Sequence, residues 1–445
     1  MTIVRFAPSP TGLIHVGNVR MALVNWLHAD ALSGRFILRL DDTDVERSTD
    51  DFATAIQRDL DWLGLTWDQL EKQSARMERY GQAFEKLRQM DRIYPCYETA
   101  QELMFKRKRQ LSAHKPPIYD RAGLSLTDQQ RQDFETEGRQ PHWRFKLDHA
   151  AIGWTDLVRG EVHFDGAHLS DPVLVRGDGS YLYMMPSAVD DIDMAVTDVI
   201  RGEDHVANTA VQIQLFEALG ATPPCFAHVP LLTDPGGKGL SKRLGSLTVQ
   251  SLREDGLEAM AINSYLAHIG TSDAIEPRRS LTDLAGDFDI SHTGRGTPKF
   301  DPDQLASLNA AVLHGLDFEQ ASDRLNQLGL DPIDANFWNA VRPNLNKFED
   351  VKLWHRVCFG NIDPAIDDEE FIIAAAAQLP PEPWDTSTWK NWTGALKKAT
   401  GRKGKSLFLP LRLALTGFDH GPELKLLLPL IGHERAMTRL KGGFH

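Results

Sequence analysis

The sequence predicts an α/β fold with a parallel sheet, followed by an α-helical domain. Strand-like and helix-like segments alternate from Ile3 to Leu63, and the same alternation returns between Asp171 and Val229. After Pro298, leucine and alanine recur at helical spacing to the end of the chain. With 445 residues the chain is too long for one ordinary hydrophobic core, so we expect several domains.

The N-terminal elements follow the order strand, helix, strand, helix. The apolar run Ile3 to Ala7 predicts a strand, and the stretch up to Gly34 predicts a helix because its apolar residues fall on one face. Phe36 to Leu40 predicts a second strand, and Asp51 to Leu63 predicts a second helix. Sheets of this kind bind ligands at the carboxyl ends of their parallel strands, so the residues after these strands are candidates for a site.

The alternation is interrupted between residues 92 and 170. This stretch is polar and contains the basic run Lys106 to Arg109, which predicts an insertion into the α/β domain. A strand at Val196 to Arg201 and a helix near Val211 to Leu219 mark where the α/β pattern resumes.

The composition is that of a globular protein, with 42% hydrophobic and 25% charged residues. The N-terminus lacks the basic start and apolar run of a signal peptide, and no stretch has the length that a bilayer requires. The three cysteines, Cys96, Cys225 and Cys358, are too widely spaced for a disulfide framework. We therefore expect a cytoplasmic protein with no membrane association.

The net charge of −13 does not exclude binding to nucleic acid, because binding depends on local charge. Basic residues gather at Lys106 to Arg109 and again between Lys390 and Lys405. For each cluster taken alone, an ordinary solvated surface is an equal alternative.

The segment Phe6 to Asn18, FAPSPTGLIHVGN, is the first candidate binding site. A strand ends here in a rigid turn of proline and glycine, and His15 and Gly17 lead into a helix. A glycine at position 17 lets a flat ligand such as adenine approach the backbone. His15 offers a hydrogen bond to a phosphate at the helix N-terminus. The spacing His-x-Gly alone is a weak signal, since most such pairs are ordinary turns.

The loop Asp234 to Ser246, DPGGKGLSKRLGS, is the second candidate. Its glycines predict a loop, and Lys238, Lys242 and Arg243 give it positive charge. Such charge stabilises a triphosphate while pyrophosphate leaves. A basic glycine loop that stands alone is more often a surface turn.

Together, FAPSPTGLIHVGN and the downstream LSKR resemble the two signature motifs of the class I aminoacyl-tRNA synthetases, and more narrowly those of the bacterial glutamyl-tRNA synthetases. LRLDDTDVERST, VDDIDMAVTDVIRGEDHVANT and LFLPLRLALTGFDHGPEL resemble further stretches of that family, in family order. The resemblance implies a class I Rossmann-like catalytic domain with an inserted acceptor-binding domain, followed by an α-helical anticodon-binding domain. The expected boundaries are 1–91 and 171–232 for the catalytic halves, 92–170 for the insertion, 233–300 for a connecting region with the lysine loop, and 301–445 for the anticodon-binding domain.

The resemblance also implies a reaction and its partners. The substrates would be L-glutamate, ATP with Mg²⁺, and tRNA, which is contacted at its acceptor end and its anticodon. Glutamyl-adenylate forms first, and the glutamyl group then passes to the 3′ end of tRNA(Glu). The family expectation is a monomer that requires tRNA for efficient activation of glutamate.

Carried over position by position, the resemblance implies a role for individual residues. His15 and Lys242 would be catalytic, with the lysine stabilising the transition state. Arg5 would bind the side-chain carboxylate of glutamate, Arg201 its α-carboxylate, and Asp41 its ammonium. The glutamate pocket would comprise Arg5, Ala7, Ser9, Asp41, Tyr183, Ser187 and Arg201. The ATP site would comprise Pro8, Thr11, His15, Gly17, Asn18, Lys238, Ser241, Lys242 and Arg243.

On the residues alone, three of these positions have simpler interpretations, and Asp41, like Asp44, could be a cap or turn residue. Arg5 on a strand could pair with a nearby aspartate, and Tyr183 could be a core aromatic. The order of the motifs favours the functional interpretation.

Four positions depart from the family pattern. Asp41 stands where glutamate is usual, so its contact with the ammonium is direct, water-mediated or absent. Asn18 replaces the second histidine of the nucleotide motif, at a variable position. Gly239 replaces a lysine, with Lys238 one residue earlier, and Ser187 stands where asparagine is frequent.

Some relatives bind zinc through clustered cysteines in the insertion. Here Cys96 has no second cysteine nearby, and His114 and His142 are scattered in the sequence, so we predict no zinc and no other metal site on the protein. Magnesium is expected only with ATP, held by phosphates and water.

Two other functions remain open. Enzymes that glutamylate a modified tRNA base lack the anticodon-binding region, whereas this chain continues well beyond Pro298. A tRNA-binding paralogue with weakened catalysis is supported only by Gly239 and Asp41. The sequence does not show whether tRNA(Gln) is also glutamylated, or which residue reads the anticodon.

Overall fold

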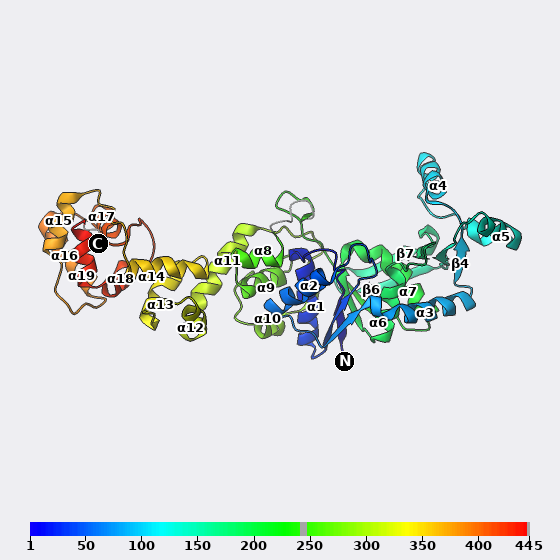
Figure 1. The fold of residues 1–445 in the computed structure, drawn as a ribbon, viewed down its shortest axis with the longest axis horizontal. Coiled ribbons are helices and arrows are strands. Elements are labelled where there is room, and N and C mark those ends of the chain that lie inside the picture. Colours follow the sequence, from blue (N-terminus) through cyan, green and yellow to red (C-terminus); the bar gives the residue numbers. More distant parts are fainter. Residues whose placement is uncertain (241–246, 443–445) are drawn as a thin grey trace. The chain divides into compact units, whose positions relative to one another are not determined.

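A computed structural model describes residues 1–240 and 247–442, so Ser241, Lys242 and Arg243 lie outside the described residues (Figure 1). The chain divides into two compact units. The first comprises Met1–Glu254 and Ile262–Asp301, and the second comprises Asp255–Ala261 and Pro302–His445. Within the described residues, no helix has the length and apolarity that a membrane span requires.

The first unit begins with a parallel sheet of three strands in the order β1-β2-β3, namely β1 (Ile3–Phe6), β2 (Arg35–Leu40) and β3 (Gln69–Lys72). Two helices connect the strands, α1 (Val16–Ala31) and α2 (Asp50–Trp62). The Thr49 hydroxyl caps α2 by accepting a hydrogen bond from the Phe52 amide, which fixes where this helix begins. The predicted order of strand, helix, strand and helix is confirmed.

A second sheet has the order β7-β6-β10-β9, with β6 (Ala151–Asp156), β7 (Gly160–Asp165), β9 (Asp198–Gly202) and β10 (Cys225–Val229). The segment before β9 lies beside β1, because the Ile3 amide donates to Thr197 Oγ1 (2.8 Å) and the Thr197 amide donates to the Ile3 carbonyl (2.9 Å). The strand order reverses between β1 and β9. This is the kind of crevice in which α/β sheets bind ligands.

Two strands of the predicted insertion belong to a third sheet, antiparallel and in the order β4-β5-β8, with β4 (Ile93–Cys96), β5 (His142–Phe145) and, beyond the predicted insertion, β8 (Val173–Val175). Helices α4 (Ala100–Ser112) and α5 (Asp128–Thr136) bury none of their residues and extend away from β4 (Figure 1). Strand pairing crosses the predicted edges of residues 92–170, since β6 pairs with β10 and β8 pairs with β5. Pairing between distant strands leaves no local periodicity in the sequence.

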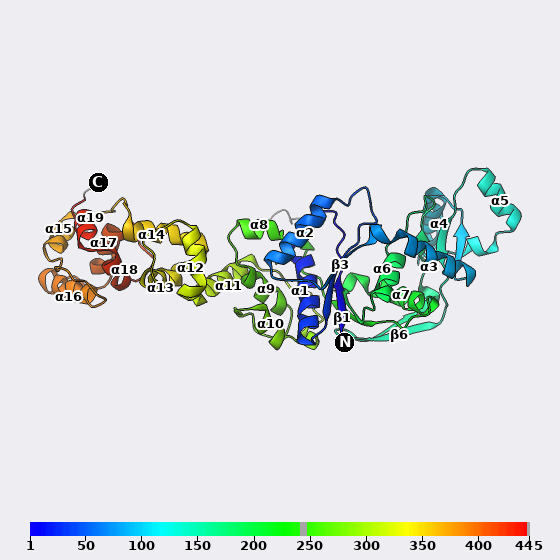
Figure 2. The ribbon, with the colours of Figure 1, turned by 60° about the horizontal axis from the view of Figure 1, so that its bottom comes forward.

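Six further helices of the described residues belong wholly or mainly to the first unit. They are α3 (Met77–Gln89), α6 (Met184–Asp193), α7 (Val206–Ala218), α8 (Val249–Glu254), α9 (Ala259–His268) and α10 (Leu281–Asp287), with the first residues of α9 counted in the second unit. Figures 1 and 2 show α1 and α6 on opposite sides of the first sheet. The site described below lies on the α6 side.

The second unit is α-helical over the part that the structure describes, as the periodicity after Pro298 predicts. Its helices are α11 (Pro302–Gly315), α12 (Phe318–Gln327), α13 (Ala335–Val341), α14 (Val351–Phe359), α15 (Glu369–Ala377), α16 (Thr388–Thr400), α17 (Lys405–Thr416), α18 (Leu424–Ile431) and α19 (His433–Leu440). Trp338 and Trp392 are fully buried in a core that these helices build among themselves. This unit therefore has a hydrophobic core of its own.

Candidate active site

Two arginines of the first sheet meet a single carboxylate of α6. Arg5 pairs in register with Ile37, and Arg39 lies two positions further along β2, so both side chains project from the same face. Arg5 Nε donates to Asp191 Oδ1 (3.1 Å), and Arg39 Nη1 donates to the same oxygen (2.7 Å). Burial alone would raise the pKa of Asp191, but the two guanidinium groups outweigh it and hold this pKa below its ordinary value.

Arg39 also holds two of the predicted site residues. Its Nε donates to Asp41 Oδ1 (2.7 Å), and its Nη2 donates to Asp41 Oδ2 (3.2 Å) and to Ser187 Oγ (3.2 Å). Sequence reasoning missed Arg39, which is completely buried. A charged residue inside the apolar strand FILRL is the signal that could have found it, because such a charge needs partners.

Tyr183, Ser187 and Asp191 lie four residues apart in sequence, along one face of α6 and the turn before it. The Tyr183 hydroxyl accepts a hydrogen bond from Asn208 Nδ2 (2.7 Å) and lies 3.2 Å from His205 Nδ1. Tyr183 is 37% exposed, so it is not a core aromatic. Its hydroxyl is held in place at the edge of the site.

Arg201 on β9 has a different environment. It is 8% exposed, its Nε lies 3.3 Å from His228 Nε2, and its Nη2 donates to Thr209 Oγ1 (2.6 Å). In the described residues no carboxylate forms an ion pair with it. Burial lowers the pKa of Arg201 to about 10, which still leaves it charged at neutral pH. Arg201 is therefore a buried cation that the protein has not neutralised, and such a group favours an anionic ligand.

The turns after β1 and β2 are joined by backbone hydrogen bonds. The Asp41 amide donates to the Pro8 carbonyl (3.0 Å), and the Thr49 amide donates to the Pro10 carbonyl (3.1 Å). Of the other predicted residues in this turn, Ala7 is half-buried, whereas Ser9 and Thr11 are exposed.

His15 is the N-terminal cap of α1. Its Nδ1 accepts a hydrogen bond from the Gly17 amide (3.1 Å), so Nε2 carries the proton and is the donor that remains. Burial lowers the pKa of His15, which keeps the imidazole neutral. A Cβ at position 17 would lie 3.0 Å from the His15 ring, so a larger residue there would push the imidazole out of this position. Asn18 completes the cap through Oδ1, which accepts from the His15 amide (3.5 Å).

The residues on either side of 241–246 are fixed by backbone contacts. After this segment, the Leu247 carbonyl accepts from the Val16 amide (3.1 Å) and the Val249 amide donates to the Ile14 carbonyl (3.1 Å). Before it, the Lys238 amide donates to Asp234 Oδ1 (2.8 Å). The chain thus re-enters the described structure directly beside the His15 cap.

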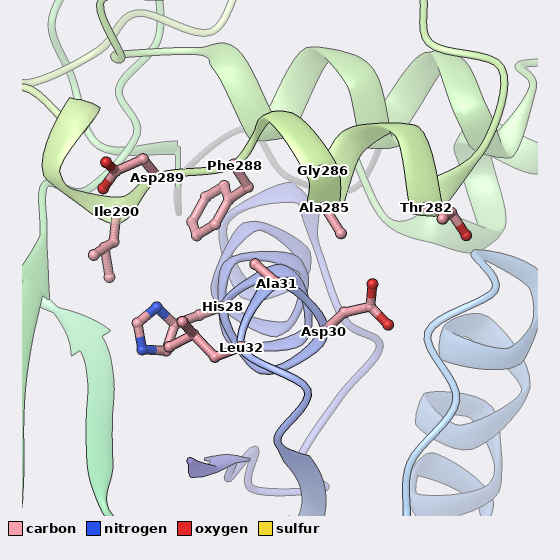
Figure 3. Close-up of a pocket in the computed structure, with 10 residues that line it drawn as sticks. All are labelled: His28, Asp30, Ala31, Leu32, Thr282, Ala285, Gly286, Phe288, Asp289 and Ile290. Atoms are coloured by element: carbon pink, nitrogen blue, oxygen red, sulfur yellow. The ribbon is translucent and has the colours of Figure 1, made fainter. Parts of the chain in front are cut away.

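A cavity of about 540 Å³ lies at the other end of α1 (Figure 3). It is bounded by the last turn of α1 and by α10 with the 3-10 turn Ile290–His292, and its lining includes His28, Asp30, Phe288 and Asp289. None of the predicted site residues lines it. This cavity is separate from the crevice between β1 and β9.

In the insertion, the structure brings Cys96, Glu98 and His142 together, with candidate ligand atoms within 4.8 Å of one another. His142 is thus not scattered in space, because it pairs with Cys96 across β4 and β5. The Tyr119 hydroxyl lies 3.4 Å from Cys96 Sγ and 2.9 Å from Glu98 Oε1, and burial raises the pKa of Cys96 to about 11. Within the described residues this group offers three ligand atoms, one fewer than a closed tetrahedral zinc site has.

Residues 1–306 match the family model described as tRNA synthetases class I (E and Q), catalytic domain, and residues 367–444 match an anticodon binding domain. Glutamate–tRNA ligase 1 of Parvibaculum lavamentivorans is 57% identical over 99% of this chain and 98% of its own length, and glutamate–tRNA ligase of Azospirillum brasilense has the same identity and coverage. A solved glutamate tRNA ligase of Elizabethkingia meningosepticum, described as in complex with its amino acid, is 26% identical with a TM-score of 0.85, covering 99% of this chain and 98% of that one. The chain therefore belongs to the glutamate–tRNA ligase family of class I tRNA synthetases.

Proposed function

We propose that this member of the family activates L-glutamate with ATP and esterifies it to the 3′ end of tRNA(Glu). The α-carboxylate of glutamate attacks the α-phosphorus of ATP, pyrophosphate leaves, and glutamyl-adenylate forms. The terminal ribose hydroxyl of tRNA then attacks the activated carbonyl, and AMP leaves. No protein nucleophile takes part, so catalysis depends on positioning and on charge stabilisation.

The observation that supports this proposal is the pair of buried arginines on either side of the crevice. Arg201 carries a charge that no described carboxylate neutralises, which suits the α-carboxylate of glutamate. Arg5 uses only Nε within the described structure, so its terminal nitrogens are available to the side-chain carboxylate. Tyr183 lies within electrostatic reach of both arginines. Two carboxylate-binding groups within electrostatic reach of each other match a dicarboxylic amino acid.

The remaining roles in the glutamate pocket belong to the same proposal. Asp41 receives the ammonium with the lone pairs that its two hydrogen bonds from Arg39 leave free. Ser187, tied to Arg39, takes the position of the more usual asparagine. Ala7 and Ser9 line the pocket next to Arg5.

ATP is proposed to lie against the His15 cap. His15 donates Nε2–H to a phosphate, and Gly17 admits the nucleotide to the backbone. Further contacts are assigned to Pro8, Thr11, Asn18, Lys238, Ser241, Lys242 and Arg243, of which 241–243 lie outside the described residues. Lys242 would stabilise the transition state, and Mg²⁺ would be held by phosphates and water.

The anticodon-binding match at residues 367–444 favours this function over glutamylation of a tRNA base, because base-modifying relatives lack that region. The proposal includes a monomer that acts in the cytoplasm, where tRNA is charged. Sedimentation of the purified chain, alone and with tRNA, measures its oligomeric state.

The decisive experiment is glutamate-dependent exchange of pyrophosphate into ATP, measured with and without tRNA, followed by charging of purified tRNA(Glu) and tRNA(Gln). We expect exchange with glutamate, stimulation by tRNA, and charging of tRNA(Glu). Aspartate and glutamine serve as matched control amino acids. Binding of tRNA without any exchange would instead identify a regulatory tRNA-binding protein.

A further inference from the structure

A buried chain of polar groups lies behind Arg201. His228 on β10 is the register partner of Arg201 on β9, and Asp156 ends the neighbouring strand β6. Thr209 on α7 closes the group from the other side. His228 and Thr209 are completely buried, and Asp156 is 2% exposed, so none of the three contacts bulk water.

The hydrogen bonds determine where the proton of His228 lies. Asp156 Oδ2 is 2.5 Å from His228 Nδ1, and Asp156 Oδ1 accepts from the amides of Val158, Arg159 and His228. A carboxylate with this many donors is anionic, so Nδ1 carries the proton and donates it to Asp156. Nε2 is then an acceptor.

Both groups that approach His228 Nε2 can donate to it. Arg201 Nε–H is 3.3 Å away and the Thr209 hydroxyl is 2.9 Å away, and that hydroxyl in turn accepts from Arg201 Nη2. One edge of the guanidinium, formed by Nε and one Nη2 hydrogen, is therefore held by uncharged acceptors. Nη2 also donates to the His205 carbonyl at 3.5 Å, so Nη1 is the nitrogen that remains for a ligand.

We propose that His228, fixed by Asp156, is a positioning residue that orients Arg201 through a neutral acceptor and so leaves the charge of Arg201 for the α-carboxylate of glutamate. This inference rests on the proposed function. A carboxylate at position 228 would orient the guanidinium equally well but would neutralise it. An apolar residue would not orient the guanidinium, and it would leave the Nε–H without an acceptor.

The titration behaviour of the group is consistent with these roles. Burial lowers the pKa of His228 below its ordinary value. Burial acts to raise the pKa of Asp156, but the hydrogen bonds from His228 and from backbone amides lower it to about 2. At neutral pH the imidazole is uncharged and the carboxylate is charged.

The test compares His228→Leu, His228→Gln and Thr209→Val in the full chain, by glutamate-dependent ATP–pyrophosphate exchange in the presence of tRNA. His228→Leu should raise KM for glutamate by about 10- to 100-fold, because it leaves a buried donor of Arg201 without its acceptor, and leave KM for ATP within about twofold. His228→Gln keeps an acceptor and should recover most of the affinity for glutamate. Thr209→Val is nearly isosteric and should raise the same KM by a smaller factor.

Thermal unfolding of each variant identifies those that fold. If His228→Leu does not fold, Thr209→Val is compared with wild type instead, because this substitution removes only a hydroxyl. A raised KM for glutamate in Thr209→Val then supports the inference. The inference is wrong if the folded variants keep the wild-type KM for glutamate, if KM for ATP rises equally, or if Gln and Leu at 228 behave alike. Wild-type exchange is measured first: its absence would refute the proposed function, whereas wild-type activity with unaffected variants would refute only this inference.

Discussion

The two arginines assigned to the carboxylates of glutamate lie in opposite electrostatic surroundings. Arg5 shares Asp191 with Arg39, which also binds Asp41, so cations and anions balance within that cluster. Arg201 is held by a neutral imidazole and a hydroxyl. Arg5 therefore offers the substrate mainly well-oriented hydrogen-bond donors. Arg201 offers it a positive charge that no carboxylate of the described residues neutralises. The protein has fixed two identical side chains by different means, and the predictions below test that difference.

The largest effect is expected from Arg201→Met. Losing a buried charge contact to the substrate should cost about 2–5 kcal/mol, or roughly 30- to 4,000-fold in kcat/KM for glutamate. Folding stability should change little, because no carboxylate loses its partner. Pyrophosphate exchange and urea unfolding measure the two quantities. Arg159→Met is the control, since Arg159 is more exposed and pairs with Glu203, and it should leave kcat/KM within a few-fold. Equal losses in both variants would contradict the assignment.

Asp191→Asn should strongly reduce folding stability, which Arg201→Met should leave almost unchanged. It leaves Arg5 and Arg39 without their shared anion, so the free energy of unfolding should fall by about 3–5 kcal/mol at pH 7. Because the pKa of Asp191 is depressed in the folded state, its stabilisation is present above the unfolded pKa of about 3.9 and is lost as pH falls through the folded value. The difference from wild type should therefore shrink in urea titrations below about pH 4.

Asp193→Asn is the matched control on the same helix, because Asp193 pairs with Arg76 and Arg79 near the surface. Its effect should stay below about 1 kcal/mol. A loss as large as that of Asp191→Asn would show that α6 is sensitive to any lost charge.

Each side contains residues that the sequence could predict and one that it could not. Local sequence patterns correctly predicted the strand that carries Arg5 and the helix that begins at His15 and Gly17. Arg39 and His228 were missed, because each lies in an apolar strand and acquires its partners only when distant segments pack together. The strand pairing of the insertion was hidden for the same reason. A polar residue in an otherwise buried strand is the transferable signal.

The pH dependence of KM for glutamate should distinguish the surroundings of Arg201 from those of Arg5, with an effect of intermediate size. His228 is neutral at pH 7, and protonation below its ordinary pKa of about 6.5 would remove the acceptor for Arg201. KM for glutamate should be constant from about pH 8 to 6.5 and rise only below the ordinary pKa of a histidine, because burial lowers the pKa of His228, and His228→Gln should abolish the rise. The charged and titratable groups around His228 are Asp156, Arg201, Arg159 and His205. A rise that persists in His228→Gln would assign the titration to one of these neighbours.

The smallest effect is expected from Tyr183→Phe. Its hydroxyl is held by Asn208 and His205 at a partly exposed edge, so one hydrogen bond to the substrate should contribute only about 2- to 5-fold in KM for glutamate. Exchange kinetics at saturating ATP give this value. Asn208→Ala should produce a similar change, because it releases the same hydroxyl. A loss comparable to that of Arg201→Met would place Tyr183 at the centre of charge recognition.

The bond between Ile3 and Thr197 joins residues 194 positions apart, and it has a consequence for synthesis of the chain. A ribosome makes β1 first, yet the outer edge of β1 finds its neighbour only when the segment before β9 has emerged. Throughout that interval the amides and carbonyls along one edge of this apolar strand remain unpaired. Unpaired strand edges of this kind promote aggregation of nascent chains. Contacts of such long range also slow folding. The crevice that separates Arg5 from Arg201 therefore cannot form until this segment has emerged, and binding of glutamate would show that the two segments have paired.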